Sequence, residues 1–227
     1  MNLKQHFSGS KGNLYTLEHE GQKLLLECGV PESKIREAVD FTLHEYCGCL
    51  ITHEHQDHAF AAWNVARAGV PVFASKGTMD SYVKPTPYTA IKALVGFTLG
   101  CFSILPFDVE HDAAEPLGFL IQAGDEKLLF ATDTCYLKYK FEGLTQLAIE
   151  CNWSEKTLSD EMPFPQIERI KRSHMSLERL IKMLKANDLS LVKKIHLLHI
   201  SSGNGDSGLF VSEVQELTGI PTYCIGG

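Results

Sequence analysis

The sequence predicts a mixed α/β fold, organised as a single domain over residues 1–227. Short apolar runs bounded by turn residues recur along the chain, and several are separated by stretches in which apolar side chains have helical spacing. A length of 227 residues, with 44% hydrophobic and 22% charged residues, is that of an ordinary globular chain with a sizeable core. This composition excludes disordered, collagen-like and membrane-spanning classes.

The first half of the chain alternates expected strands with expected helices. Residues 13–16 and 23–28 are expected to pair around the turn at Glu20 and Gly21, and a helix over residues 31–40 opens with Pro31 in its first turn. A buried strand, a helix closed by Gly69 and another strand are then expected over residues 47–52, 59–68 and 70–74.

The second half contains most of the expected strands and the clearest helix. Strands are expected over residues 96–105, 117–123, 127–131 and 147–151. A helix is expected over residues 176–187 because Leu177, Leu180, Ile181 and Leu184 recur at the spacing of one buried face, and Ser176 suits its N-cap. A strand over residues 195–200, a glycine-rich loop over 201–208 and a helix over 211–217 follow.

The overall charge and the first residues further narrow the classes of protein to which the chain could belong. A formal charge of -7, from 21 Lys and Arg against 28 Asp and Glu, argues against a uniformly basic surface that coats nucleic acid. No segment approaches the roughly 20 consecutive apolar residues of a membrane-spanning helix, and the first residues contain no apolar signal-peptide region. The sequence therefore predicts a cytoplasmic protein that does not enter a membrane.

The most informative stretch, residues 51–58, follows an expected strand and opens an expected helix. Three imidazoles and a carboxylate fall within six residues: His53, His55, Asp57 and His58. A single histidine here would most simply be a surface or capping residue. The whole cluster instead predicts a metal site, because imidazole nitrogen and carboxylate oxygen are ligands of divalent metals.

This pattern resembles the signature of the metallo-β-lactamase superfamily, which implies a four-layer αββα sandwich with a dinuclear metal site. Further ligands follow in the expected order, each near the end of a strand: His111, Asp133 and His199. Alone, Asp133 could cap a turn and His199 could be a core histidine. Because Asp133 is present, the resemblance favours the RNase Z-like group and its small bacterial nuclease-like relatives over secreted β-lactamases.

The resemblance assigns a role to each residue of the set. It implies that His53, His55 and His111 hold one Zn²⁺ or Mn²⁺ ion, that Asp57, His58 and His199 hold a second, and that Asp133 bridges the two ions. A hydroxide between the ions would be the nucleophile, since a bound divalent ion lowers the pKa of water from 15.7 to about 7.

Three residues are expected to be catalytic: Asp57 and Asp133, which are also expected ligands, and His174, which is not a ligand. In the resembling enzymes a histidine near this place faces the substrate phosphate and can protonate a leaving group. The simpler interpretation is that His174 is a residue at the start of a helix and forms only a local hydrogen bond. Two other positions depart from the family pattern: Glu27 replaces an aspartate that orients the site, and Trp153 replaces a histidine.

Charge is unevenly distributed along the chain. Residues 169–194 contain eight basic and two acidic side chains, a local charge of +6 against -13 elsewhere. These residues could be a solvated helix face or a strip that guides a polyanionic substrate. With two divalent ions, Asp57, Asp133 and a hydroxide, the site itself would carry one net positive charge, which suits a phosphodiester.

The sequence thus predicts a dinuclear metal-dependent hydrolase, most simply a phosphodiesterase acting on nucleic acid or a cyclic nucleotide. The alternatives are a thioester, lactone or lactam hydrolase with the same site, and a non-catalytic metal-binding protein. The resemblance is also compatible with a homodimer.

Overall fold

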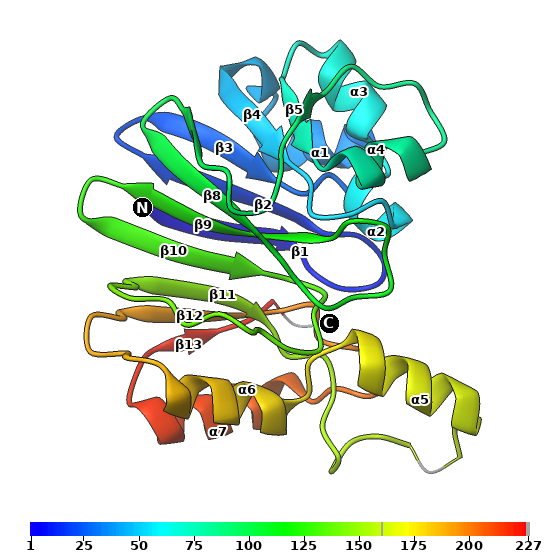
Figure 1. Ribbon diagram of the computed structural model, residues 1–227, viewed down its shortest axis with the longest axis vertical. Coiled ribbons are helices and arrows are strands. Elements are labelled where there is room, and N and C mark those ends of the chain that lie inside the picture. Colours follow the sequence, from blue (N-terminus) through cyan, green and yellow to red (C-terminus); the bar gives the residue numbers. More distant parts are fainter. Residues whose placement is uncertain (160, 226–227) are drawn as a thin grey trace. The chain divides into compact units, whose positions relative to one another are not determined.

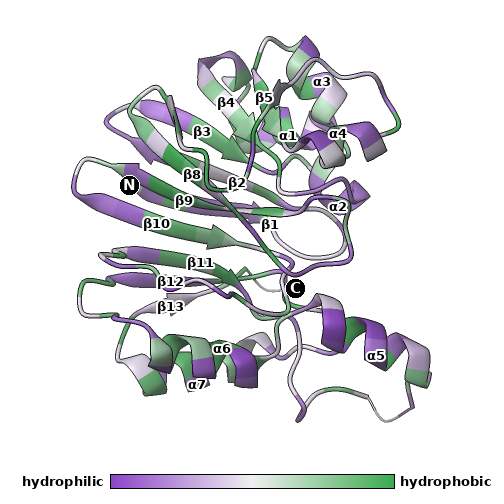
Figure 2. Ribbon diagram, viewed as in Figure 1, coloured by the Kyte–Doolittle hydropathy of each residue, from purple (hydrophilic) through white to green (hydrophobic). Residues whose placement is uncertain are grey.

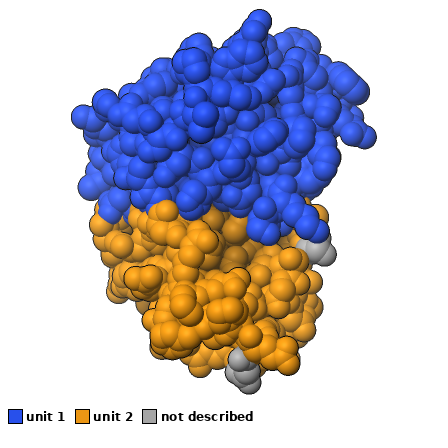
Figure 3. Space-filling view, turned by 90° about the vertical axis from the view of Figure 1, so that its right-hand side faces the viewer, with its two compact units in different colours: residues 1–108, 113–125 blue, residues 109–112, 126–227 orange. Residues whose placement is uncertain are grey.

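The computed structural model describes residues 1–159 and 161–225, which divide into two compact units. Unit 1 consists of Met1–Asp108 and Ala113–Asp125, and unit 2 consists of Val109–Asp112 and the described residues from Glu126 onward. Figure 3 colours the two units separately. Among the described residues, no helix has both the length and the apolar composition that crossing a membrane requires.

Unit 1 contains a mixed sheet in which six strands follow one another in chain order. Its antiparallel part is formed by β1 (Asn2–Phe7), β2 (Leu14–His19) and β3 (Gln22–Leu26). The strands added in parallel are β4 (Tyr46–Leu50), β5 (Val72–Ala74) and β6 (Thr89–Ala90). The helical segments of the unit are α1 (Glu32–Ala38), η1 (Leu43–Glu45), α2 (Gln56–Ala59), α3 (Ala62–Arg67) and α4 (Lys76–Ser81).

Three of these helices cover one face of the parallel strands. Ile35 of α1, Val65 of α3 and Met79 of α4 pack in one buried cluster with Cys49 of β4 and Val72 of β5. Figure 1 shows α1, α3 and α4 gathered beside β4 and β5. Burial of apolar side chains from the helices and from the strands stabilises this part of the sheet. The histidine-rich turn (residues 51–58) begins here, directly after β4.

Unit 1 also contains an antiparallel ribbon of β7 (Phe97–Leu99), β8 (Phe102–Asp108) and β9 (Leu117–Ala123). The sequence predicted one strand over residues 96–105, which was wrong. The chain turns at Gly100, whose φ of 59° lies in the left-handed region that glycine adopts without steric cost.

Unit 2 is built on four strands that all run parallel: β10 (Glu126–Ala131), β11 (Gln146–Glu150), β12 (Lys194–Leu198) and β13 (Thr222–Tyr223). Its helices are α5 (Phe164–Ser173), α6 (Leu177–Ala186) and α7 (Ser207–Thr218). Helices α6 and α7 lie side by side along β11, β12 and β13 (Figure 1).

The predicted helix over residues 176–187 is confirmed as α6. Leu177, Leu180 and Leu184 are buried, and the Ser176 side chain accepts a hydrogen bond from the Arg179 N–H at 3.3 Å. Figure 2 shows apolar and polar residues alternating along this helix. The 3.6-residue periodicity therefore identified the buried face correctly.

Other segments differ from the sequence expectations. The expected helix over residues 59–68 is two short helices, α2 and α3, because the chain leaves helical geometry at Ala61. Six elements were not expected: β1, η1, α4, β6, α5 and β13. Strands β6 and β13 have two residues each, too few to show a periodicity.

One pH dependence follows from the core of unit 2. Burial disfavours the charged ring of His196 and Lys194 repels it, so its pKa is lowered to about 4. Between about pH 6.5 and pH 4, His196 is protonated in the unfolded chain but not in the folded chain. The free energy of unfolding therefore falls as the pH is lowered through this interval. His196→Leu should remove on the order of 2 kcal/mol of this fall, measured by urea unfolding at a series of pH values. His44→Leu, at an exposed histidine, is the control, and equal pH slopes in wild type and His196→Leu would contradict the prediction.

Candidate metal centre

The histidine-rich turn of unit 1, residues 51–58, follows β4 and includes the start of α2. Its imidazoles crowd together: the ring centroids of His53 and His55 are 4.6 Å apart, and those of His53 and His58 are 4.1 Å apart. His53 and His58 are buried, whereas His55 and Asp57 are partly exposed. The turn therefore presents both fully enclosed and solvent-accessible ligand atoms.

The atoms of this turn are spaced as metal ligands are. Two ligand atoms on one tetrahedral zinc, each bonded at 2.0–2.1 Å, lie about 3.3 Å apart. His53 Nε2 lies 3.0 Å from His55 Nδ1, and His58 Nε2 lies 3.4 Å from Asp57 Oδ2. His53 with His55, and Asp57 with His58, are the two pairs that the family resemblance assigns to different ions. The donor set and its spacing fit divalent metal ions.

Hydrogen bonds hold the turn against the segment that follows β3 and against Asn13, which precedes β2. The Cys28 N–H donates to the His58 carbonyl at 2.9 Å, and the Asn13 side-chain amide donates to the Asp57 carbonyl at 3.0 Å. A Cβ on Gly29 would lie only 1.6 Å from the Asp57 carbonyl oxygen, so only glycine permits this approach. Glu27, Cys28 and Gly29 therefore position the turn.

Glu27 lies beneath the turn, fully buried. Its Oε2 accepts a hydrogen bond from the Thr52 N–H at 3.3 Å, and its Oε1 lies 3.5 Å from His58 Nδ1. The carboxylate thus reaches both ends of the turn although it replaces the aspartate of the family pattern. The Glu27 backbone is left-handed, with φ at 65°.

In unit 2 the predicted residues follow the ends of adjacent parallel strands. Asp133 comes two residues after β10 and His199 directly after β12, and parallel strands place their carboxyl ends at one edge of a sheet. Both residues have left-handed backbones, with φ of 39° and 51°. Non-glycine residues in this region cost of the order of 1 kcal/mol each, and such strain concentrates at functional sites.

Asp133 directs its two oxygens at different imidazoles. Oδ2 lies 3.6 Å from His111 Nε2, and Oδ1 lies 3.3 Å from His199 Nδ1. Asp133 is 3% exposed, and Thr132 Oγ1 donates to its Oδ1 at 2.8 Å. A carboxylate so placed can give one oxygen to each of two ions.

His111 is prepared as a neutral ligand. Its Nδ1–H donates to the Ser173 carbonyl at 2.8 Å, which leaves the lone pair on Nε2, the nitrogen nearer Asp133. Burial lowers the pKa of His111, although Asp133 and other nearby groups partly oppose this shift. The ring is therefore uncharged near neutral pH and able to bind a metal.

His174 joins the same group of unit 2. Its ring centroid is 5.2 Å from that of His111 and 5.5 Å from that of His199. Its Nδ1–H donates to Glu150 Oε1 at 2.6 Å. Burial works against the charged ring, but the charge and hydrogen bond of Glu150, with a contribution from Asp133, outweigh it and raise the pKa of His174.

Glu150, to which the sequence reasoning assigned no role, is the centre of this group. It is fully buried at the end of β11, and its Oε2 accepts hydrogen bonds from the Thr134 and Met175 N–H groups, both at 2.9 Å. Oε1 accepts from His174 and lies 3.3 Å from His199 Nδ1. Burial favours a raised pKa, but the interactions with His174 and His199 outweigh it and lower the pKa of Glu150. A glutamate ending an otherwise apolar strand was the available sequence signal.

Trp153, at the position where the family pattern led us to expect histidine, has a structural role. Its ring is 2% exposed, and its Nε1–H donates to the His174 carbonyl at 3.2 Å. The neighbouring Asn152 side chain donates to the His199 carbonyl at 2.8 Å. Residues 150–153 therefore position both His174 and His199.

The fold and these two residue sets define a protein of the metallo-β-lactamase class. Residues 35–200 match the beta-lactamase superfamily domain, and the chain belongs to this family. The predicted superfamily and fold class are therefore confirmed.

Similar proteins agree with this placement. The chain is 29% identical to "Exodeoxyribonuclease WalJ" of Streptococcus pneumoniae over 87% of its own length and 80% of that protein. It is 29% identical to "Exodeoxyribonuclease YycJ" of Bacillus anthracis over 60% of its own length, and spans 56% of that relative. The metallo-β-lactamase fold protein YhfI of Bacillus subtilis superposes with a TM-score of 0.74 and 14% identity, covering 99% of this chain and 95% of that structure.

The buried carboxylate of Glu150 gives a stability prediction. Glu150→Ala leaves the Thr134 and Met175 N–H groups and the His174 Nδ1–H without their acceptor, and should lower the free energy of unfolding by about 3 kcal/mol. Urea unfolding in the presence of a chelator measures this without a contribution from metal. Glu142→Ala, at an exposed glutamate, is the control. A Glu150→Ala variant as stable as this control would show that the contacts contribute nothing.

Proposed function

We propose that the chain is a dinuclear metal-dependent phosphodiesterase that hydrolyses DNA. His53, His55 and His111 would hold one ion, Asp57, His58 and His199 the other, and Asp133 would bridge them. The observation that carries the proposal is the orientation of Asp133, whose two oxygens face two different imidazoles. The spacing of the ligand pairs in the histidine-rich turn supports it.

When bound, divalent ions supply a nucleophile at neutral pH by lowering the pKa of water, and they polarise the phosphoryl group. The protein supplies the geometry and the proton. Glu150 holds His174 through Nδ1, which directs the other ring nitrogen, Nε2, away from the carboxylate. Glu150 raises the pKa of His174, which favours the protonated ring, and a proton on Nε2 could pass to the leaving oxygen of the phosphodiester.

DNA is proposed as the substrate because the relatives in S. pneumoniae and B. anthracis bear the name exodeoxyribonuclease. The ligand set of imidazoles and carboxylates accepts either zinc or manganese. A homodimer and a cytoplasmic location stay predictions from the sequence.

Removal of Asp133 tests the proposed centre. Asp133→Ala should lower the hydrolysis of bis(p-nitrophenyl) phosphate by at least about 10³-fold, because the bridging carboxylate orients both ions. Metal content is measured on the same sample. Asp125→Ala, at an exposed aspartate in a turn, should keep wild-type activity. Full activity of Asp133→Ala with metal still bound would disprove the assigned role.

Basic residues of α5 support a polyanionic substrate. Arg169 and Arg172 line a cavity of about 260 Å³ together with His111, all within unit 2. Arg169 is held by an ion pair with Asp112 at 2.8 Å, and Arg172 is exposed. Lys171 lies with its Nζ 5.9 Å from the centre of the Trp153 ring. Arg169 and Arg172 therefore lie beside His111, a proposed metal ligand, and Lys171 lies beside Trp153, which positions His174.

Substitution of two of these cations tests their role. Lys171→Ala with Arg172→Ala should weaken binding of single-stranded DNA and reduce the salt slope of log K by about 1.4, the value expected for two lost phosphate contacts. Fluorescence anisotropy at several salt concentrations measures both quantities. The control is Lys193→Ala with Lys194→Ala, which removes the same charge at two exposed lysines outside α5. Equal salt slopes for the two double variants would show that only the net charge of the protein matters, and would contradict a specific role for Lys171 and Arg172.

A further inference from the structure

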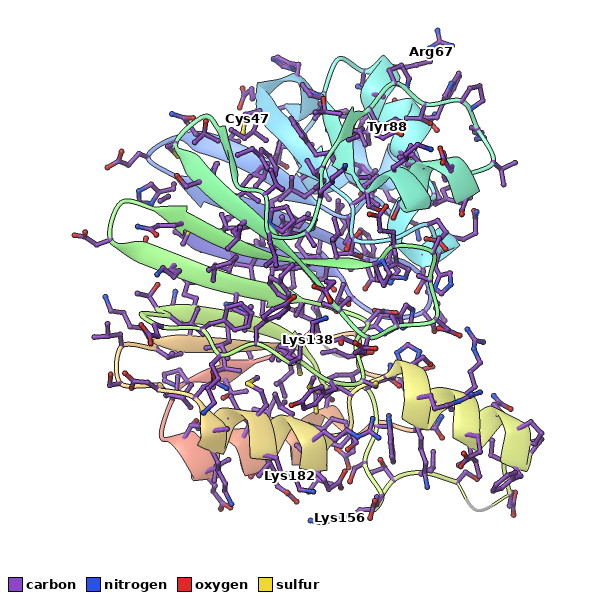
Figure 4. The ribbon with its side chains drawn as sticks, viewed as in Figure 1. Cys47, Arg67, Tyr88, Lys138, Lys156 and Lys182 are labelled. Atoms are coloured by element: carbon purple, nitrogen blue, oxygen red, sulfur yellow. The ribbon has the colours of Figure 1, made fainter. Side chains whose placement is uncertain are left out.

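The loop after β10 and helix α6 enclose a second cavity of unit 2, of about 310 Å³. Two tyrosines and four cations line it: Tyr136, Lys138, Tyr139, Lys140, Arg179 and Lys182. Figure 4 labels Lys138 on the loop and Lys182 on α6. No acidic side chain is among the described residues that line this cavity.

The cavity is held in shape by contacts within unit 2. Thr134 Oγ1 donates to the Tyr136 carbonyl at 2.7 Å, which fixes the start of the loop. At its end, the Phe141 N–H donates to the Asn187 side-chain oxygen at 3.4 Å, beside the last turn of α6. Arg179 ties the loop to the end of α5, since its Nη1 donates to the Lys171 carbonyl at 2.7 Å and to the Cys135 carbonyl at 3.3 Å.

Tyr136 is exposed to solvent and Tyr139 and Phe141 are partly exposed, whereas Leu137 is buried. Tyr136 is 59% exposed, whereas Leu137 beside it is 6% exposed. The Lys138 Nζ lies 5.4 Å from the centre of the Tyr139 ring, and the Tyr139 and Phe141 rings are 6.3 Å apart. The loop thus presents aromatic faces with cations beside them.

We propose that this aromatic and basic cavity binds single-stranded nucleic acid, with bases stacked on Tyr136 and Tyr139 and phosphates beside Lys138, Lys140 and Lys182. A ligand that matches both features must carry flat π-systems and regularly spaced negative charge, as a nucleic acid strand does. Proteins that hold single strands combine stacking aromatic residues with a basic groove in this way. A duplex would present its phosphates but not its base faces.

The cavity also lies close to Asp133, which matters if the proposed function is correct. Tyr136 is three residues after Asp133, and a trans chain extends by at most about 3.6 Å per residue, so their Cα atoms are within about 11 Å. Nucleotides next to the phosphodiester at Asp133 would therefore reach Tyr136. The cavity is a binding subsite for the strand beside the bond that is cleaved.

The test is the affinity of the metal-loaded protein for a fluorescent phosphorothioate oligo-dT, which resists hydrolysis. Tyr136→Ala should raise Kd about tenfold, because the base that stacks on this ring loses its partner. Tyr136→Phe keeps the ring and should keep the affinity. Tyr223→Ala is the matched control, at a tyrosine that is 48% exposed on β13. Thermal unfolding verifies that all variants are folded.

The outcomes separate this subsite from the proposed activity. If wild type hydrolyses single-stranded DNA but Tyr136→Ala and Tyr139→Ala bind oligo-dT as Tyr223→Ala does, the subsite is wrong and the proposed function stands. If wild type neither binds nor hydrolyses DNA, the proposed function fails and the subsite with it. Binding to anionic lipid vesicles in place of oligo-dT would also overturn the proposal.

Discussion

The carboxylate of Glu150 is the interaction on which the candidate site of unit 2 depends. Its oxygens receive hydrogen bonds from the segment after β10 and the segment between α5 and α6, and Oε1 also lies 3.3 Å from the histidine after β12. A buried carboxylate without partners would be costly, so these segments must meet around it. The same contacts that satisfy its charge place Thr134, His174 and His199 at one edge of the sheet.

Left-handed backbones recur at strand ends in both units. Glu27, Asp133 and His199 all adopt left-handed backbones, a conformation that non-glycine residues reach only when their surroundings compensate. Hydrogen bonds to or from each of these residues provide that compensation: Glu27 with Thr52, Asp133 with Thr132, and His199 with Asn152. The backbone turns sharply where each side chain must point back toward the site.

Much of the architecture could be predicted from local signals. The leucine spacing of α6, the buried strands β11 and β12, and the turn after β4 each follow from the side chains of a few neighbouring residues. The short strands β6 and β13 form by pairing with segments distant in sequence, which no local pattern contains. Helix α5 was missed because its basic and polar residues give it little apolar character.

The candidate site was predictable where residue types are diagnostic of metal binding. Clustered histidines identified the turn, and family order identified His111, Asp133 and His199. Glu150 and Asn152 were not assigned roles because their partners, His174 and His199, lie more than 20 residues away in the chain. Their importance comes from burial and from long-range hydrogen bonds, which a single sequence does not encode locally.

Anomalous diffraction from crystals loaded with zinc or manganese tests the central claim most directly. Two ions are expected, one beside each oxygen of Asp133, with Glu150 remaining hydrogen-bonded to His174. In unit 2, possible ligand atoms of Asp133, Glu150, His174 and His199 also lie within 4.8 Å of one another. A single ion held by Glu150 and His174 would contradict the dinuclear centre and the role given to each of these residues.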